Sequence, residues 1–127
     1  MMYLATSINE SPVIAEKAGV AIADVRGRAV KFANGAVVLV GAGEAAIGIG
    51  IMTNDETIKQ GDDITVQVKD MGVVYAGAAI TKGAELAVGE NGALVPATEG
   101  KYVVAIALEE ATDAGVFIKV QLAKYKI

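Results

Sequence analysis

The sequence contains no cysteine, no histidine and no tryptophan. The missing thiols exclude a disulfide framework and a cysteine nucleophile, and the missing imidazoles exclude a histidine base. Zinc sites in proteins use mainly these two residue types, so we expect no metal site of the usual kind. The two serines, Ser7 and Ser11, have no base to activate them. We therefore predict a non-enzymatic protein without a cofactor.

Excess positive charge and long apolar runs are also missing. Lys and Arg number 11 against 15 Asp and Glu, which gives a net charge of -4 and argues against a nucleic-acid partner. The longest apolar stretch, residues 36–52, contains Glu44 and falls short of the roughly 20 residues that a membrane-spanning helix needs. The first residues lack the basic and apolar regions of a secretory signal. We expect a soluble protein with no membrane partner, made and kept in a reducing compartment.

What the sequence does contain is small and β-branched apolar residues in one domain's length of chain. Hydrophobic residues make up 54% of 127 positions, enough for a core without disulfides. No stretch of a dozen residues carries a helical apolar stripe without a central glycine, and the alanines stand among Val, Ile and Gly. The pattern predicts an all-β fold.

An internal repeat begins with two Asn-Gly pairs. Asn34-Gly35 separates the β-type runs 29–33 and 36–40, and Asn91-Gly92 separates the runs 84–88 and 93–95. Asn-Gly between two such runs is a strong hairpin signal, because both central residues of a type I′ turn have positive φ. The sequence therefore predicts a hairpin in each half of the chain.

The repeat extends beyond the hairpins. Residues 47–52 correspond to 103–108, and the alternating segment 64–68 corresponds to 118–122. The repeated units are thus about 24–68 and 80–122, with four strands each, and Met71–Ile80 is predicted to add another strand with its turn. Because we expect neither unit to bury its apolar face alone, both should pack into a single β domain, residues 18–127. A β-sandwich and a squat β-barrel both remain open.

The N-terminal segment, residues 1–17, has no partner in the repeat. One interpretation is a frayed terminus or a strand laid on its own sheet. The other is an extended arm that docks on another subunit by adding a strand. In the second case we expect the contact to use the apolar residues of the segment: Tyr3, Leu4, Ile8, Pro12, Val13 and Ile14.

Two motifs resemble ligand-binding sites, but the sequence around them lacks the elements or the spacing that such sites need. Gly41–Ala46 has the spacing of a dinucleotide-binding glycine loop, but strand-like alternation follows where a helix is required, so we interpret it as a loop between strands. Acidic pairs such as Asp55-Glu56 and Glu109-Glu110 lack the alternating spacing of a calcium loop. They are interpreted as solvated surface, with a weak cation site between the two loops as the alternative.

The order of glycines, turns and strands resembles that of the capsid cement or head-decoration proteins of tailed bacteriophages. The resemblance covers about residues 19–122 and is carried by the phrases "GRAVKFANGAVVLVGAGEAAIGIG", "GDDITVQV", "ITKGAELAVGENGALVPA" and "VVAIALEEATDAGVFIKVQL". The glycines that match the family pattern are Gly27, Gly48, Gly61, Gly83, Gly92 and Gly115.

The resemblance implies a structural virion protein. It would be made in the host cytoplasm, bind the major capsid protein on the capsid exterior as a homo-oligomer, most often a trimer, and clamp neighbouring capsomers together. One alternative is a freestanding ligand- or glycan-binding β module, which a pocket lined by Tyr75, Tyr102 and Phe117 would favour. Another is a biotinyl or lipoyl carrier domain, for which Lys69 is the nearest candidate acceptor.

Overall fold

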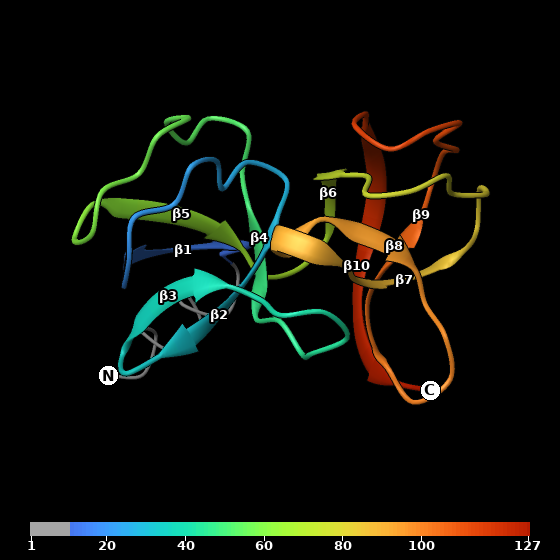
Figure 1. The fold of residues 1–127 in the computed structure, drawn as a ribbon, viewed down its shortest axis with the longest axis horizontal. Helices are drawn as coiled ribbons and strands as arrows, with labels where there is room; N and C mark the ends of the chain where they lie inside the picture. Colours follow the sequence, from blue (N-terminus) through green and yellow to red (C-terminus); the bar gives the residue numbers. More distant parts are fainter. Residues whose placement is uncertain (1–10) are drawn as a thin grey trace.

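The computed structural model describes residues 11–127, which form ten β-strands and no α-helix (Figure 1). The first sheet has the order β1-β5-β4-β2-β3 and contains β1 (Val13–Lys17), β2 (Ala29–Ala33), β3 (Ala36–Leu39), β4 (Gly48–Gly50) and β5 (Asp63–Gln67). The second has the order β6-β10-β9-β7-β8 and contains β6 (Met71–Tyr75), β7 (Glu85–Val88), β8 (Leu94–Pro96), β9 (Tyr102–Ala107) and β10 (Phe117–Lys126). The predicted all-β fold is confirmed.

Each sheet forms one lobe, and the two lobes lie side by side (Figure 1). Residues 13–67 make up the first lobe and residues 71–126 the second. All strand pairs within the sheets are antiparallel. Neither sheet closes into a barrel, and the arrangement is consistent with the predicted β-sandwich.

The two sheets have the same strand order, so the internal repeat comprises five strands and not four. The first strand of each sheet, β1 or β6, pairs with the long strand β5 or β10. Residues 13–17 therefore do have a counterpart, and the prediction that the whole N-terminal segment lies outside the repeat was wrong for them. These residues form a strand on their own sheet, which was one of the two interpretations.

The chain that follows the first strand of each sheet confirms this equivalence. Ala18 forms a parallel bridge with Val37, and Ala76 forms the same bridge with Leu94. Further along, Ile22 bridges the loop before β5, and Ile80 bridges the loop before β10. The matching sequences AGVAI, which starts at Ala18, and AGAAI, which starts at Ala76, are the repeat signal. They identify β1 as the equivalent of β6 in the other sheet.

The two Asn-Gly turns differ in length. Asn34 and Gly35, with φ of 52° and 79°, form the predicted two-residue turn between β2 and β3. Asn91 and Gly92 also have positive φ, 54° and 76°, but Val88 pairs with Leu94, so residues 89–93 separate β7 from β8. The extra residues form the 3-10 turn η1 (Glu90–Gly92). This turn projects beyond the second sheet toward the first lobe.

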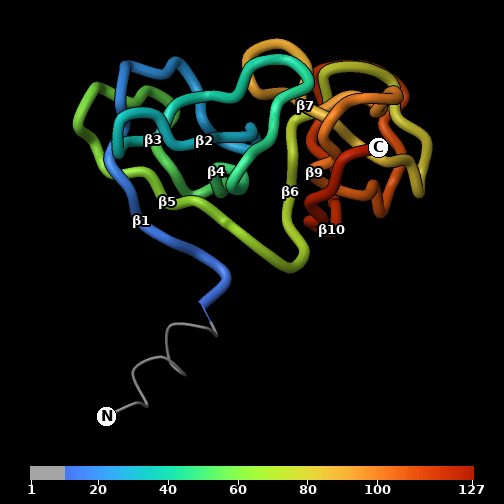
Figure 2. The backbone as a smooth tube through the Cα atoms, turned by 90° about the horizontal axis from the view of Figure 1, so that it is seen from below, coloured from blue at the N-terminus to red at the C-terminus, as the bar shows by residue number. Residues whose placement is uncertain are grey.

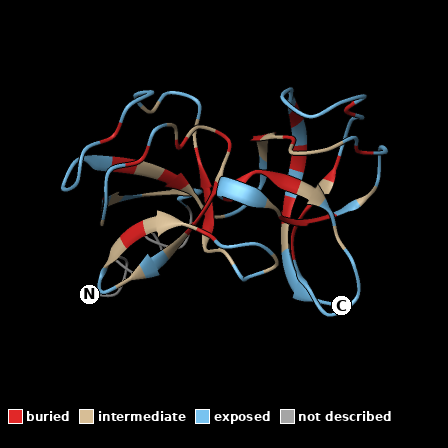
Figure 3. Cartoon of the chain, viewed as in Figure 1, coloured by how far each residue is buried: buried red, intermediate tan, exposed pale blue. Residues whose placement is uncertain are grey.

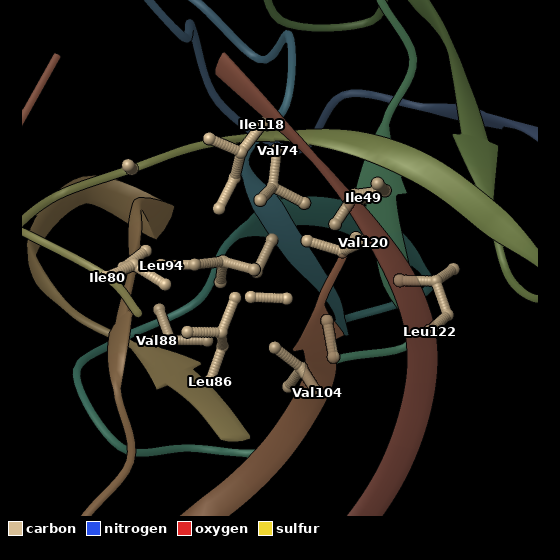
Figure 4. Close-up of a cluster of buried hydrophobic side chains, with 14 of the residues drawn as sticks. Ile49, Val74, Ile80, Leu86, Val88, Leu94, Val104, Ile118, Val120 and Leu122 are labelled. Atoms are coloured by element: carbon tan, nitrogen blue, oxygen red, sulfur yellow. The ribbon is translucent and has the colours of Figure 1, made fainter. Parts of the chain in front are cut away.

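Each lobe has its own buried apolar cluster (Figure 3). The first cluster is built from residues of the first lobe alone: Ala18, Ile22, Val25, Val30, Val37, Ile58, Ile64 and Val66. The second cluster adds three residues of the first lobe, Ala29, Val40 and Ile49, to those of the second. Figure 4 shows Ile49 beside Val120 in this cluster. The first lobe thus has a cluster of its own, but three of its buried residues depend on packing against the second lobe.

Strand β4 passes close to neighbouring backbone because it carries glycine at Gly48 and Gly50. A Cβ atom at Gly48 would collide with the carbonyl oxygen of Gln67, and one at Gly50 with that of Val25. Both clashes involve backbone atoms, which cannot turn aside as a flexible side chain can. The pattern Ile47-Gly48-Ile49-Gly50-Ile51 therefore places Ile49 in the second core while its flanking glycines let the strands approach.

We expect Gly48→Ala to destabilise the protein by about 3 kcal/mol, because overpacking against backbone forces the strand to shift. The control is Gly41→Ala, where the nearest atoms belong to the exposed side chain of Glu44. Urea denaturation monitored by circular dichroism gives both values. Equal stabilities for the two variants would contradict the close approach of β4.

Candidate functional site

Two adjoining cavities form a groove between the lobes. Their volumes are about 470 and 640 Å³, and Arg28 and Asn91 line both. The first cavity is otherwise lined by a mostly apolar segment of the first lobe: Val20, Ala21, Ile22, Ala23, Asp24 and Leu39. The second is lined mainly by the second lobe: Tyr75, Gly77, Gly89, Glu90, Ala93, Val95 and Ala114. We call the two cavities together the inter-lobe groove.

Gly27 brings the two lobes into backbone contact at this groove. Its carbonyl oxygen accepts a hydrogen bond from the N–H of Tyr75 at 2.8 Å. Its φ is +69°, and a Cβ atom there would lie 2.9 Å from both the Tyr75 nitrogen and a ring carbon of Phe117. Only glycine combines this backbone conformation with this lack of space. The sequence Arg26-Gly27-Arg28 thereby places Arg28 at the lobe boundary.

The side chain of Arg28 is held in place from two directions. Its guanidinium carbon lies 4.2 Å from the centre of the Tyr75 ring, a cation–π contact. Tyr75 in turn meets Phe117 edge to face, with ring centres 5.4 Å apart. Arg28 Nη1 also donates a hydrogen bond to the carbonyl oxygen of Asp24 at 3.1 Å. Only 16% of the Arg28 side chain is exposed, so its orientation is fixed by its surroundings.

The neighbouring charges leave Arg28 with spare hydrogen-bonding capacity. Asp24 is engaged mainly by Arg26, which donates from Nε and Nη2 at 3.1 and 3.0 Å. This pairing lowers the pKa of the Asp24 carboxyl below its ordinary value of 3.8. Arg28 Nη1 lies 3.6 Å from the same carboxylate, and among residues 11–127 no acceptor is assigned to its Nε or Nη2. Within the described residues, those N–H groups therefore have no assigned protein acceptor.

A second feature lies where the chain crosses from one lobe to the other. The N–H of Val68 donates to the carbonyl oxygen of Pro12 at 2.8 Å, and Lys124 Nζ donates to the carbonyl oxygens of Ile47 and Val68. Burial lowers the pKa of Lys124. Beside this crossing, Met71 is 61% exposed. We call the surface around Pro12, Val68 and Met71 the linker face.

The predicted contact residues divide between the described and undescribed parts of the chain. Pro12 is exposed on the linker face, and Val13 and Ile14 are half-buried in β1, where they pair with Gln67 and Val66. Ile14 packs against the first core. Tyr3, Leu4 and Ile8 lie outside the described residues. The described residues thus place Pro12 at an exposed surface beside the linker and use Ile14 partly for packing.

The polar residues of the groove were not predicted from the sequence. The sequence identifies Gly27 only as one of the glycines that match the family pattern and Asn91 as a turn residue, and it gives Arg28 no role. Packing of the lobes brings Arg28 and Asn91 together from positions far apart in the chain. A signal was present in the longer loop of the second hairpin, residues 89–93, which lets η1 reach the first lobe: a Cβ atom at Gly92 would contact Ala29 and Leu39.

Other sequence motifs occupy ordinary structural positions. Tyr75 and Phe117 contact each other, but Tyr102 lines a different cavity together with Tyr125, so the three do not share a pocket. Gly41–Ala46 is a loop followed by β4 and not by a helix. Lys69 lies in the connection between the two sheets. Within residues 11–127 there is no cluster of three or more acidic residues placed to hold a metal ion, and no helix there could cross a membrane.

Comparison with known proteins gives one family and one fold. Residues 7–122 match the family described as phage cement protein. No curated protein matches the chain. Among solved structures, the N base of head fiber gp8.5 of bacteriophage phi29 superposes with a TM-score of 0.67 at 19% sequence identity. That match covers 91% of this chain and 96% of the other, and it supports the fold described above.

The ion pair of Asp24 predicts an acid-sensitive contribution to stability. Because the folded-state pKa of Asp24 is lowered, the contribution is present above the ordinary carboxyl pKa and is lost as pH falls through the folded value. Urea midpoints measured from pH 6 down to pH 3 should fall more steeply for the wild type than for Asp24→Asn. Asp55→Asn, which alters an exposed loop carboxylate, should retain the wild-type slope. Identical slopes for wild type and Asp24→Asn would contradict the assignment.

Proposed function

The chain belongs to the phage cement protein family, and on this premise we propose that it binds the outer surface of a phage capsid and holds neighbouring capsomers together. The observation that carries the proposal is the family match over residues 7–122, which spans both lobes. The protein is a structural, capsid-associated protein of a phage. In the proposed role its partner is the major capsid protein, and it acts as a homotrimer.

The two-lobe body suits a clamp. The lobes share a core through Ile49 and are joined by backbone hydrogen bonds, such as that between Gly27 and Tyr75. A body of this kind resists separation of the surfaces to which its lobes attach. A protein that binds the assembled shell and not the free subunits stabilises the shell by mass action. In a trimer, each further contact becomes intramolecular and adds avidity.

The proposed role is non-enzymatic, because clamping requires complementary surfaces and no bond is made or broken. We place the protein on the exterior of the virion after synthesis in the host cytoplasm. An acidic exterior, with a net charge of -4, is suited to a protein that should not adsorb nucleic acid.

The N-terminal segment supplies part of the contact in this proposal. Pro12 directly precedes β1 beside the linker face, and the sequence before it includes the apolar residues Tyr3, Leu4 and Ile8. A short segment that carries apolar residues and joins a rigid body at an exposed point can reach a neighbouring surface. The body then provides the remaining contact.

Deleting residues 1–10 should abolish binding to undecorated shells while the far-ultraviolet circular dichroism spectrum stays unchanged. This deletion keeps β1 and the hydrogen bond between Pro12 and Val68, so the first sheet retains its edge strand. Co-sedimentation with shells measures binding.

A matched pair of substituted chains separates side-chain contact from chain length. Replacing Tyr3, Leu4 and Ile8 together by Ser should weaken co-sedimentation as the deletion does. Replacing the polar residues of the same segment, Thr6, Ser7 and Asn9, by Ala should leave it unchanged. Undiminished binding by the deletion variant would refute a role for the segment.

A further inference from the structure

We propose that the inter-lobe groove binds the N-terminal segment of a second copy of the chain. In this assignment the carboxylate of Glu10 meets Arg28 and Asn91, and the side chain of Ile8 enters the apolar half of the groove beside Val20. The inference deepens the proposed self-association and rests on it. It names the surface that one subunit offers to the next.

The groove has the composition of a peptide-binding site. In its apolar half, Val20 is 51% exposed and Leu39 is half-buried. Arg28 and Asn91 line both cavities, while the acidic residues Asp24 and Glu90 line one each. Binding sites typically combine an apolar lining with a few fixed polar groups, and they occur preferentially where two structural units meet.

Arg28 is prepared for a carboxylate. The Tyr75 ring and the Asp24 carbonyl oxygen fix its guanidinium before any ligand arrives, so little side-chain entropy remains to be lost on binding. Arg26 already engages the Asp24 carboxylate at two atoms, which leaves Nε and Nη2 of Arg28 for an incoming anion. A guanidinium with two such groups binds a carboxylate through parallel hydrogen bonds.

Residues 1–10 carry the complementary chemistry. Glu10 is the only charged side chain among them, and Ile8 precedes it by two positions. In an extended strand, residues two apart project from the same face. In the proposed complex the segment binds in extended form, so that Ile8 and Glu10 enter one groove together. Val20 and Arg28, which they meet there, line the same cavity. Tyr3 and Leu4 remain available for the capsid.

The position of Pro12 favours a second copy over the same chain. Val13 pairs with Gln67, Gln67 with Ile49, and Ile49 with Ala29, which neighbours Arg28. These three strand spacings amount to about 14 Å. The two residues from Pro12 to Glu10 span about 7 Å at most, so the backbone of Glu10 in the same chain ends about 7 Å short of the strand beside Arg28.

The linker face and the inter-lobe groove also lie on different sides of the molecule. Figure 2 shows the start of β1 and the connection from β5 to β6 on one side, and the segment that follows β1 on the other. A contact between the linker face of one copy and the groove of the next joins two different surfaces. Such a head-to-tail contact closes into a ring when the rotation permits, as in a trimer.

Disulfide trapping tests this assignment cleanly, because the chain contains no cysteine. Ile8→Cys protein labelled with nitrogen-15 is mixed with unlabelled Val20→Cys protein and oxidised, and heterodimers are identified by mass. The control partner is Leu108→Cys, which is 36% exposed and lines neither cavity of the groove. We expect several-fold more heterodimer with Val20→Cys than with Leu108→Cys. Adding Glu10→Lys to the Ile8→Cys chain should reduce the yield.

Three results would overturn the assignment. The first is an equal yield with both partners. The second is an internal disulfide in a single Ile8→Cys, Val20→Cys chain, which would place the segment on its own groove. The third is preferential linkage of Val20→Cys to the capsid protein on decorated shells. Shell co-sedimentation of the reduced variants is measured in parallel: retained binding without the expected linkage refutes the groove assignment alone, whereas a wild-type chain that binds no shell refutes the proposed function.

Discussion

The backbone contact between Gly27 and Tyr75 is the constraint on which the rest of the site depends. At this point the lobes approach too closely for any side chain, and the positive φ of Gly27 turns the chain so that Arg28 enters the boundary. The cation–π contact with Tyr75 follows from that placement, as does the division of the inter-lobe groove into two cavities that share Arg28. Ile49 supports the same junction from within the second core.

Much of the fold could be predicted from local pattern. Alternating segments and the Asn34-Gly35 turn identified the strands of each unit, because turn chemistry and period-2 alternation are properties of neighbouring residues. The equivalence of β1 and β6 within the repeat was missed because the two strands share little sequence. Their equivalence is visible only in the Ala-Gly pairs that follow them, Ala18-Gly19 and Ala76-Gly77.

The groove could not be predicted in the same way. Its polar centre joins Arg28 from the first lobe to Asn91 from the second, and nothing local to either residue specifies the other. What joins them is the packing of η1 against β2, which depends on the longer second hairpin. The family resemblance stated from the sequence is confirmed by the match over residues 7–122. The chemistry of the contact surfaces comes from the arrangement of the lobes.

In the proposed function, the body made of two equivalent lobes binds the assembled shell and stabilises it. The most direct measurement is the melting temperature of undecorated shells, recorded by differential scanning calorimetry with and without saturating protein. The account predicts a higher melting temperature with the protein bound, because a ligand that binds only the assembled state raises its stability. An unchanged melting temperature, at concentrations where the protein co-elutes with shells, would contradict it.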